Sequence, residues 1–337
     1  MPPEEEDIMK TSHALTRLGF ALAAPLLFSA GSITTAQAQD FPNKPIRTFI
    51  TVPTGVPDVV SRMLGQQMAG SLGQPFVTEP RPGAGGLLAV QATKQSAADG
   101  YSLIFTDGAV WGIMPALRPG SFDPMKDLIP IGMVMTSSIF LSVGEKLPVK
   151  NMQEFIALAK AKPGTISYAT AGSGTLHHLF MEGVRSALGI NILHVPYARG
   201  TSEALPAFLG GNTDAMVSSL PVIEPHLKTG KARMILASTQ RRSPMAPDVP
   251  SLADIGVRGE SFSGDMGYLA PAGTPKPVVD KLADALAKAV KSTEYIEKLK
   301  AFGVEPIFRG PEEFSESLKS DLARYARAVK VAGAKMD

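Results

Sequence analysis

The sequence contains no cysteine among its 337 residues. Disulfide bonds, thiolate metal sites, cysteine nucleophiles and lipid attachment through a cysteine are therefore excluded. The chain also lacks any long run of basic residues, and its formal net charge is only +2. Nucleic acid is consequently not an expected partner, because binding to phosphates requires clustered Lys and Arg side chains.

The N-terminal segment has the layout of a secretory signal peptide. From Met9, a basic start precedes an apolar stretch over residues 18–28, and an A-x-A cleavage motif ends at Ala38. The apolar stretch is too short to span a bilayer. We therefore predict that residues 1–38 are a signal peptide, with Met9 as the true start, and that the mature protein is periplasmic and not a lipoprotein.

The remaining sequence alternates short aliphatic and β-branched runs with segments of helical periodicity. This alternation favours an α/β fold with mainly parallel sheets. A second series of the same kind opens at a capping box formed by Asn151 and Glu154. The segments expected in the first series are strands at 46–52, 75–80 and 101–107, with helices at 57–73 and 85–97 between them.

These two series predict two domains. We expect residues 39–135 plus 238–337 to form domain 1, and residues 136–237 to form domain 2. The tail after residue 237 has too few strands for a core of its own, so it should return to domain 1. Two crossing strands between two α/β lobes predict a hinged fold with a ligand cleft, as in periplasmic binding proteins.

Two glycine-containing turns lead from a predicted strand into a predicted helix. They read VPTGVPD at 52–58 and TAGSGT at 170–175. Glycine permits a close approach of the backbone to a ligand, and a helix N-terminus presents unpaired N–H groups that attract anions. Two such turns facing one cleft predict a carboxylate site, although a plain structural connection is the alternative for each turn.

The sequence does not spell an enzyme motif at the second turn. Ala171 breaks the G-x-S-x-G pattern of a nucleophile elbow, and no lysine follows the last glycine as in a P-loop. His177, His178 and Glu182 invite a metal interpretation, since His178 and Glu182 are four residues apart on one helix face. No third ligand is indicated for that pair, so a histidine that caps the turn or touches the ligand is favoured. The stretch RPGAGG at 81–86 lacks dinucleotide-loop spacing and is interpreted as a connection. We predict neither a metal nor a cofactor.

Asp58 and Arg62 lie four residues apart near the start of the first helix. An ion pair that complements the helix dipole is the first interpretation. Alternatively, a carboxylate beside an anion site needs a cationic group on the ligand, so Asp58 would distinguish amino acids from plain acids.

Ten stretches in order give the mature sequence a family resemblance. They include FPNKPIRTFITVP, GVPDVVSR, AADGYSLIF, YATAGSGTLHHL, HVPY and LAPAGTPKPVV. The chain resembles the Bug proteins, the extracytoplasmic solute receptors of tripartite tricarboxylate transporters. The resemblance implies a monomeric, type II-like Venus-flytrap fold without enzymatic activity. It also implies a small carboxylate ligand held between two lobes, and inner-membrane permease subunits as partners.

The resemblance also implies a set of ligand-binding residues by position. They are Thr54, Gly55, Val56, Pro57 and Asp58 in the first turn, Gly172, Ser173, Gly174, Thr175 and His178 in the second, and Tyr197 and Ser219 on neighbouring turns. Two departures bear on the ligand. Thr54 stands where the family commonly has glycine, and Asp265 replaces a usual tryptophan.

These observations predict a periplasmic receptor that captures a small organic carboxylate for a tripartite transporter. The ligand is open between monocarboxylates, dicarboxylates, aromatic acids and amino acids. Two alternatives also stay open, namely a secreted α/β hydrolase or lyase that uses the same cleft, and a receptor that reports its ligand to a membrane sensor.

Overall fold

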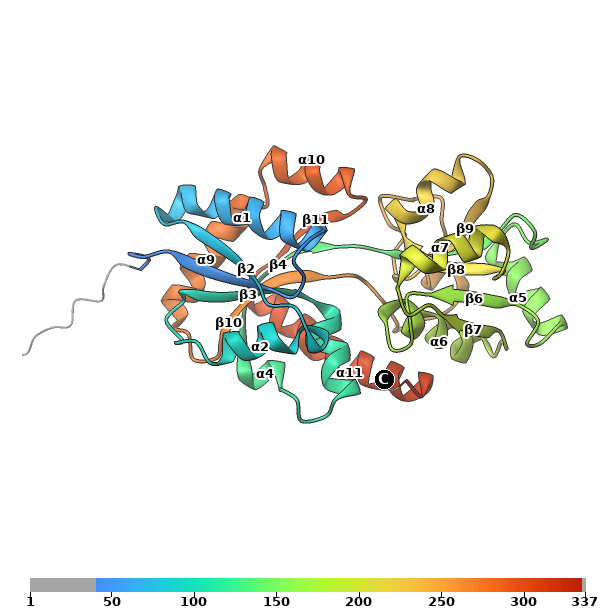
Figure 1. The fold of residues 1–337 in the computed structure, drawn as a ribbon, viewed down its shortest axis with the longest axis horizontal. Coiled ribbons are helices and arrows are strands. Elements are labelled where there is room, and N and C mark those ends of the chain that lie inside the picture. The colour runs from blue at the N-terminus through green and yellow to red at the C-terminus, as the bar shows by residue number, and fades with distance from the viewer. Residues whose placement is uncertain (1–40, 335–337) are drawn as a thin grey trace, which may run out of the picture. The chain divides into compact units, whose positions relative to one another are not determined.

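A computed structural model of the protein describes residues 41–334. The predicted signal peptide, residues 1–38, therefore lies outside the described residues. Two sheets organise the described chain, with strand orders β11-β4-β10-β3-β1-β2 and β7-β6-β8-β5-β9 (Figure 1). Within residues 41–334, no helix is both long enough and apolar enough to cross a membrane.

The six-stranded sheet takes strands from both ends of the described chain. Its strands are β1 (Ile46–Ile50), β2 (Phe76–Pro80), β3 (Ser102–Asp107), β4 (Leu128–Thr136), β10 (Met266–Pro271) and β11 (Glu305–Arg309). The helices that accompany it are α1 (Val56–Leu72), α2 (Leu87–Lys94), α3 (Met114–Leu117), α4 (Pro124–Asp127), α9 (Lys276–Ala289), α10 (Thr293–Ala301) and α11 (Pro311–Ala332).

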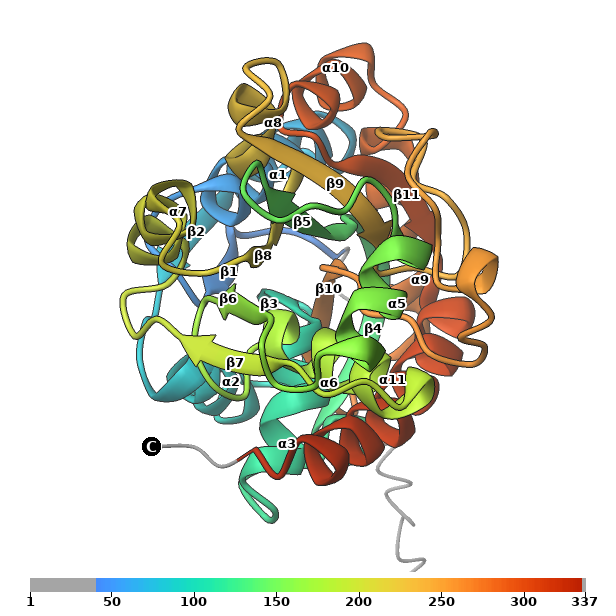
Figure 2. The same ribbon diagram turned by 90° about the vertical axis from the view of Figure 1, so that its right-hand side faces the viewer.

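The five-stranded sheet takes its strands from one continuous stretch. They are β5 (Ile139–Gly144), β6 (Ser167–Thr170), β7 (Leu193–Pro196), β8 (Ala215–Ser219) and β9 (Ala232–Ala237). Its helices are α5 (Met152–Ala161), α6 (Leu176–Leu188), α7 (Thr201–Gly210) and α8 (Leu220–Leu227). Figure 2 shows α5 and α6 on one side of this sheet, and α7 and α8 on the other.

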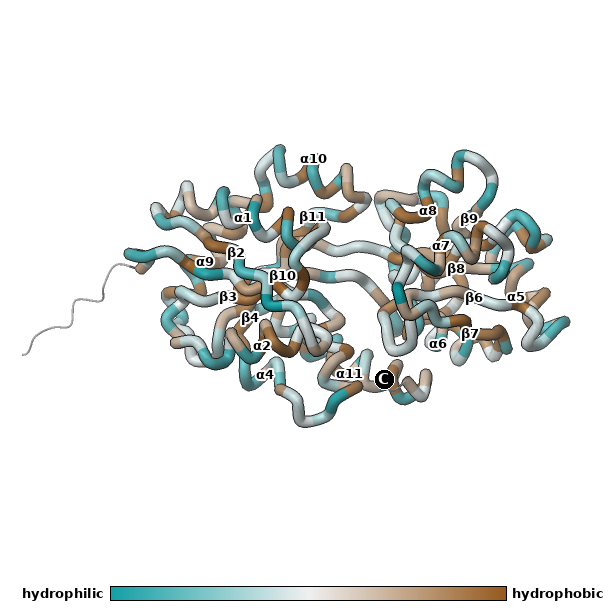
Figure 3. The backbone as a smooth tube through the Cα atoms, viewed as in Figure 1, coloured by the Kyte–Doolittle hydropathy of each residue, from teal (hydrophilic) through white to brown (hydrophobic). Residues whose placement is uncertain are grey.

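Buried aliphatic strands require helices on both faces of each sheet. In the six-stranded sheet, one apolar cluster joins the strands to α1, α9 and α10, and a second joins them to α2 and α11. The helices are amphipathic, as the alternating colours along α10 show in Figure 3, where Tyr295 and Leu299 are the buried residues. The helix predicted from the capping box is confirmed, because Asn151 Oδ1 accepts the N–H of Glu154 at 2.9 Å.

The prediction of mainly parallel sheets was wrong, because both sheets are mixed. Strand β1 is parallel to β2 and β3, whereas β10 runs antiparallel between β3 and β4. Likewise, β5 is antiparallel to both β8 and β9. The connections explain the difference. Parallel neighbours are joined by a crossover, usually a helix, whereas β5 and β10 each enter their sheet directly from the other sheet and can run antiparallel to their neighbours.

Two segments connect the sheets, residues 137–138 between β4 and β5, and residues 238–265 between β9 and β10. Helix α11 adds a further contact, because its residues Tyr325, Ala328 and Val329 belong to the apolar cluster that contains the buried face of α6. The proposed domain boundaries near residues 135 and 237 fall close to these connections and stay a prediction.

Candidate functional site

The turn between β6 and α6 has a backbone that requires glycine. Gly172 and Gly174 have φ angles of 120° and 73°, where other residues are strained. Thr175 is the N-cap of α6, and its Oγ1 accepts the N–H of His178 while donating to the carbonyl of Gly172 at 2.7 Å. This hydroxyl fixes the shape of the turn, so it is already used within the protein.

Four backbone N–H groups of this turn and helix start have no acceptor within residues 41–334. They belong to Ser173, Thr175, Leu176 and His177. The first N–H groups of an α-helix have no intrahelical partner, and together with the helix dipole they favour a bound anion. The turn therefore offers an anion several donors without an Arg or Lys.

These four residues line one cavity of about 460 Å³. Its volume lies in the usual range for small-molecule sites, roughly 300–1,000 Å³. The cavity is lined by residues of both sheet units, namely Gly85, 107–109, Ile113, Met114, Leu117, Ala171, 173–177, Ser263 and Gly264. The predicted residues Ser173, Gly174 and Thr175 are thus brought together, and Gly172 lies next to them in the same turn.

A stacked pair of histidines supports the turn from behind. His178 Nδ1 accepts the N–H of Gly174 at 3.2 Å, and the His178 ring stacks on His194 with 4.0 Å between centroids. His194 Nε2 in turn lies 2.7 Å from the Thr170 hydroxyl. His178 is buried and does not line the cavity. In the structure His178 holds the turn through this hydrogen bond, and its predicted contact with a ligand stays a prediction.

Burial keeps these imidazoles neutral. It lowers the pKa of His194 from 6.5 to about 4, with a further contribution from His178, and it also lowers the pKa of His177 to about 4. Desolvation lowers the pKa of His178 as well, although the nearby Glu182 carboxylate opposes the shift. The turn thus carries no imidazolium at neutral pH, and its attraction for an anion comes from N–H groups.

The depressed histidine pKa values predict a pH-dependent stability. In the unfolded chain His194 takes up a proton near pH 6.5, whereas in the folded chain it does so only near pH 4. The stabilisation is therefore complete above pH 6.5 and is lost as the pH falls toward 4. Urea unfolding at several pH values should show a shallower decline for His194→Gln than for the wild type. Equal pH slopes in the two proteins would contradict this assignment.

The first predicted turn, at residues 52–58, does not line this cavity. Thr54 and Gly55 are exposed, and residues 54–58 are not among its lining residues. Asp58 Oδ1 accepts from Arg62 Nε at 2.8 Å, which is the ion pair expected from the four-residue spacing. The participation of residues 54–58 in ligand binding stays a prediction.

The two weaker candidates also lie outside the cavity lining. The N–H of Tyr197 donates to the carbonyl of Thr170 at 3.2 Å, so Tyr197 continues the backbone pairing beside the turn. Ser219 precedes α8 as its N-cap but makes no side-chain capping bond. Asp265, which replaces a usual tryptophan, accepts hydrogen bonds from the hydroxyls of Thr136 and Ser263. Asp265 therefore joins the end of β4 to the segment that enters β10.

The sequence did not lead us to predict the part of the cavity lining that follows β3. Asp107 ends this strand and lines the cavity together with Gly108 and Ala109. Asp107 Oδ1 accepts the N–H groups of Ala109 and Val110 at 3.1 and 3.2 Å. Burial raises the pKa of Asp107, and these two hydrogen bonds oppose the shift. An Asp-Gly pair at the carboxyl end of a parallel strand was the signal available, because ligands bind at such ends.

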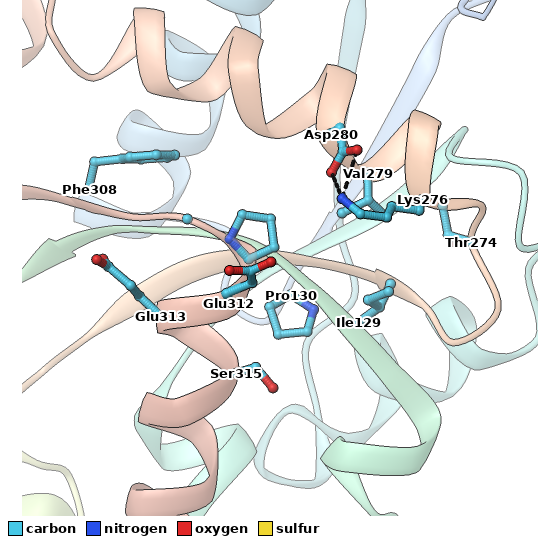
Figure 4. A pocket seen from close by; sticks show the side chains of 12 residues that line it. Ile129, Pro130, Thr274, Lys276, Val279, Asp280, Phe308, Glu312, Glu313 and Ser315 are labelled. Atoms are coloured by element: carbon cyan, nitrogen blue, oxygen red, sulfur yellow. Dashed lines mark hydrogen bonds and ion pairs between the residues drawn. The ribbon is translucent and has the colours of Figure 1, made fainter.

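A larger cavity, of about 690 Å³, lies between α9, β4 and the start of α11 (Figure 4). Lys276 is the cation on its wall, and this side chain is paired with Asp280 at 2.7 Å. Glu312 and Glu313 add two further carboxylates to the lining. Such a wall repels anions, so the smaller cavity at the glycine turn is the better carboxylate site.

No group of three or more potential metal ligands occurs in the described part of the chain. His178 Nε2 and Glu182 Oε1 are 3.8 Å apart, and Glu182 Oε1 also accepts from Arg185 at 2.6 Å and from the Tyr168 hydroxyl at 2.6 Å. Glu182 is thus engaged in a buried hydrogen-bond network behind the turn.

The family model described as "tripartite tricarboxylate transporter family receptor" matches residues 60–333. The chain belongs to this receptor family. The resemblance stated from the sequence is thereby confirmed, and the family is one of solute receptors rather than enzymes.

Curated relatives of the tripartite tricarboxylate transporter receptor family match almost end to end. A protein encoded in the gbd 5′ region of Cupriavidus necator is 36% identical over 91% of this chain and 93% of its own length. The protein BugT of Bordetella pertussis is 30% identical over 96% of this chain and 99% of its own length.

Solved structures confirm the fold of two α/β domains. A periplasmic transporter is 33% identical, with a TM-score of 0.71 over 88% of this chain and 100% of its own. A Rhodopseudomonas palustris protein solved with adipate is 26% identical, with a TM-score of 0.71 over 88% of this chain and 99% of its own. Another protein of that organism, MatC with bound malate, is 28% identical, with a TM-score of 0.68 over 86% of this chain and 100% of its own.

Proposed function

We propose that this receptor binds a small organic carboxylate in the cavity at the 170–175 turn. The proposal rests on four N–H groups without an acceptor in the described part of the chain, those of Ser173, Thr175, Leu176 and His177, which all line the cavity. A carboxylate accepts several such hydrogen bonds at once, and each charged acceptor strengthens them. The related proteins with adipate and malate support the same ligand chemistry.

The proposal assigns different tasks to the predicted residues. Ser173, Gly174 and Thr175 bind the carboxylate through the shape and the donors of their turn, and His178 holds that turn in place. We propose that residues 54–58, which lie outside the lining of this cavity, also bind the ligand through backbone N–H groups at the start of α1. Tyr197 and Ser219 shape the neighbouring backbone of the five-stranded sheet.

We also propose that the receptor works in the periplasm after removal of residues 1–38, and that it delivers its ligand to the permease of a tripartite transporter. The family match and the related periplasmic transporter support this partner. The alternative receptor that reports to a membrane sensor would use the same ligand site and would differ only in its membrane partner.

A thermal melting screen tests the proposed function. A ligand at about one hundred times its dissociation constant adds roughly 2.7 kcal/mol to the free energy of unfolding, which is readily seen as a higher melting temperature. We expect at least one compound among mono-, di- and tricarboxylates, aromatic acids and amino acids to produce this shift. Ser173→Ala should retain binding, because it keeps the backbone N–H.

The control is a turnover assay of the same compounds with the same protein. Chemical conversion of a compound that shifts the melting temperature would support the hydrolase or lyase alternative. A complete absence of shifts across all carboxylate classes would contradict the proposed function.

A further inference from the structure

Asp107 lines the proposed ligand site, and within the described residues its carboxyl group has no cationic partner. Its Oδ1 accepts the N–H groups of Ala109 and Val110, at 3.1 and 3.2 Å. Within residues 41–334, no other residue donates a hydrogen bond to Oδ2, and Asp107 forms no ion pair. Asp107 lines the same cavity as the 170–175 turn, so its Oδ2 is the oxygen left for a ligand.

Asp107 is the acidic side chain of this cavity; burial raises its pKa, and backbone N–H groups oppose that shift by favouring the carboxylate. In the described chain, no Lys or Arg is among the lining residues, and burial lowers the pKa of His177 to about 4, so its imidazole is neutral at neutral pH. A ligand carboxylate that sits on the turn therefore shares the cavity with a second carboxylate. Two like charges without a cation repel each other more strongly in a cavity than in water.

The rest of the lining is largely apolar. Ile113, Met114, Leu117 and Leu176 all contribute to the wall, and Ile113 and Met114 are buried. Apolar surface of this kind favours a hydrocarbon body and gives no compensation to a second carboxylate. The cavity thus combines N–H donors for one carboxylate, the Asp107 oxygen Oδ2 as a hydrogen-bond acceptor, and an apolar wall.

We propose that the ligand is an amino acid with an apolar side chain, and that Asp107 is the residue that selects it. This inference rests on the proposed carboxylate-binding function. The ligand carboxylate accepts the N–H groups of residues 173–177, its ammonium group donates to Asp107 Oδ2, and its side chain contacts Ile113, Met114, Leu117 and Leu176. The ammonium group supplies the cation that the cavity lacks.

Calorimetric titration at pH 7.5 tests the role of Asp107. The probes are leucine and phenylalanine, their deaminated counterparts 4-methylpentanoate and 3-phenylpropanoate, and the dicarboxylates malate and adipate. We expect an amino acid to bind roughly tenfold to a hundredfold more tightly than its deaminated counterpart, as for one hydrogen bond to a charged group. Asp107→Asn should remove this preference and improve the binding of the deaminated acids.

The Asp107→Asn variant is expected to fold, because the amide Oδ1 still accepts from Ala109 and Val110. Asp284→Asn is the matched control, since Asp284 is exposed on α9 and does not line the cavity. It should leave every affinity unchanged.

Three results separate this inference from the proposed function. Equal affinity for amino and deaminated acids, or tighter binding of malate or adipate, would overturn the role of Asp107 and leave carboxylate binding standing. An unchanged preference in Asp107→Asn would also overturn it. If none of the probes and no other carboxylate binds the wild type, both proposals fail.

Discussion

Gly174→Val abolishes measurable ligand binding, whereas Gly189→Val at the C-terminal end of α6 does not. Gly174 has a φ of 73° within the turn that lines the cavity. A β-branched residue is strained there by roughly 1–2 kcal/mol, and it relieves the strain by moving the turn. Its N–H then no longer reaches His178 Nδ1, so the four donors of residues 173–177 lose their common arrangement.

Gly189 makes a close control for this variant. It ends α6 with a φ of 61°, and a Cβ there would meet no heavy atom within 4 Å. Both variants therefore carry a similar backbone strain, but only one carries it at the cavity. Calorimetry measures binding, and circular dichroism confirms that each variant is folded. A folded Gly174→Val protein that binds as tightly as the wild type would show that the turn is only a structural connection.

Asp321→Ala lowers the free energy of unfolding by about 3–5 kcal/mol, because it breaks a buried ion pair and leaves the charge of Arg324 uncompensated. Asp321 Oδ1 accepts from Arg324 Nη2 at 2.5 Å, and its Oδ2 accepts from Trp111 Nε1 at 2.9 Å. The Asp321 and Arg324 side chains are only 6% and 11% exposed. The loss is therefore larger than that of any exposed pair.

Ligand affinity should fall together with stability in Asp321→Ala. Trp111 lies in the segment Ala109–Ile113, and both ends of this segment line the cavity. Denaturant titration gives the free energy of unfolding, and Asp280→Asn provides the exposed comparison, because its partner Lys276 is 78% exposed. Asp280→Asn should leave stability almost unchanged. A similar small loss for Asp321→Ala would contradict a structural role for the buried pair.

Local sequence patterns predicted the elements better than their arrangement. The capping box at Asn151 and the glycine-rich start of α6 depend on neighbours within a few residues, so the sequence suffices to find them. The direction of β10 depends instead on which strands receive it after the crossing from β9. Strand β11 was missed, because its five residues carry little periodicity of their own.

The candidate site divides in the same way. The turn with Ser173 and Gly174 was predicted, since glycine spacing before a helix has a direct physical meaning. Asp107 was not predicted, because its place on the cavity follows from the position of β3 between β1 and β10 in the sheet. That neighbourhood is tertiary, and the Asp-Gly pair at the end of β3 was the local signal available for it. The turn at 52–58 was predicted by the same glycine pattern, its residues 54–58 were assigned by the family resemblance, and their part in binding stays a prediction.

The central place of β10 has a consequence for the order in which the receptor is made. β10 lies between β3 and β4, although it is synthesised after the whole five-stranded sheet. During synthesis, residues 139–237 can therefore fold as a continuous unit. Strands β3 and β4 cannot complete their pairing until β10 has been synthesised. Bringing such distant segments together is slow, because a long loop must close first. Premature termination before Met266 would remove both β10 and β11, so one edge of β3 and both edges of β4 would lack partners. Unpaired strand edges are a template for aggregation.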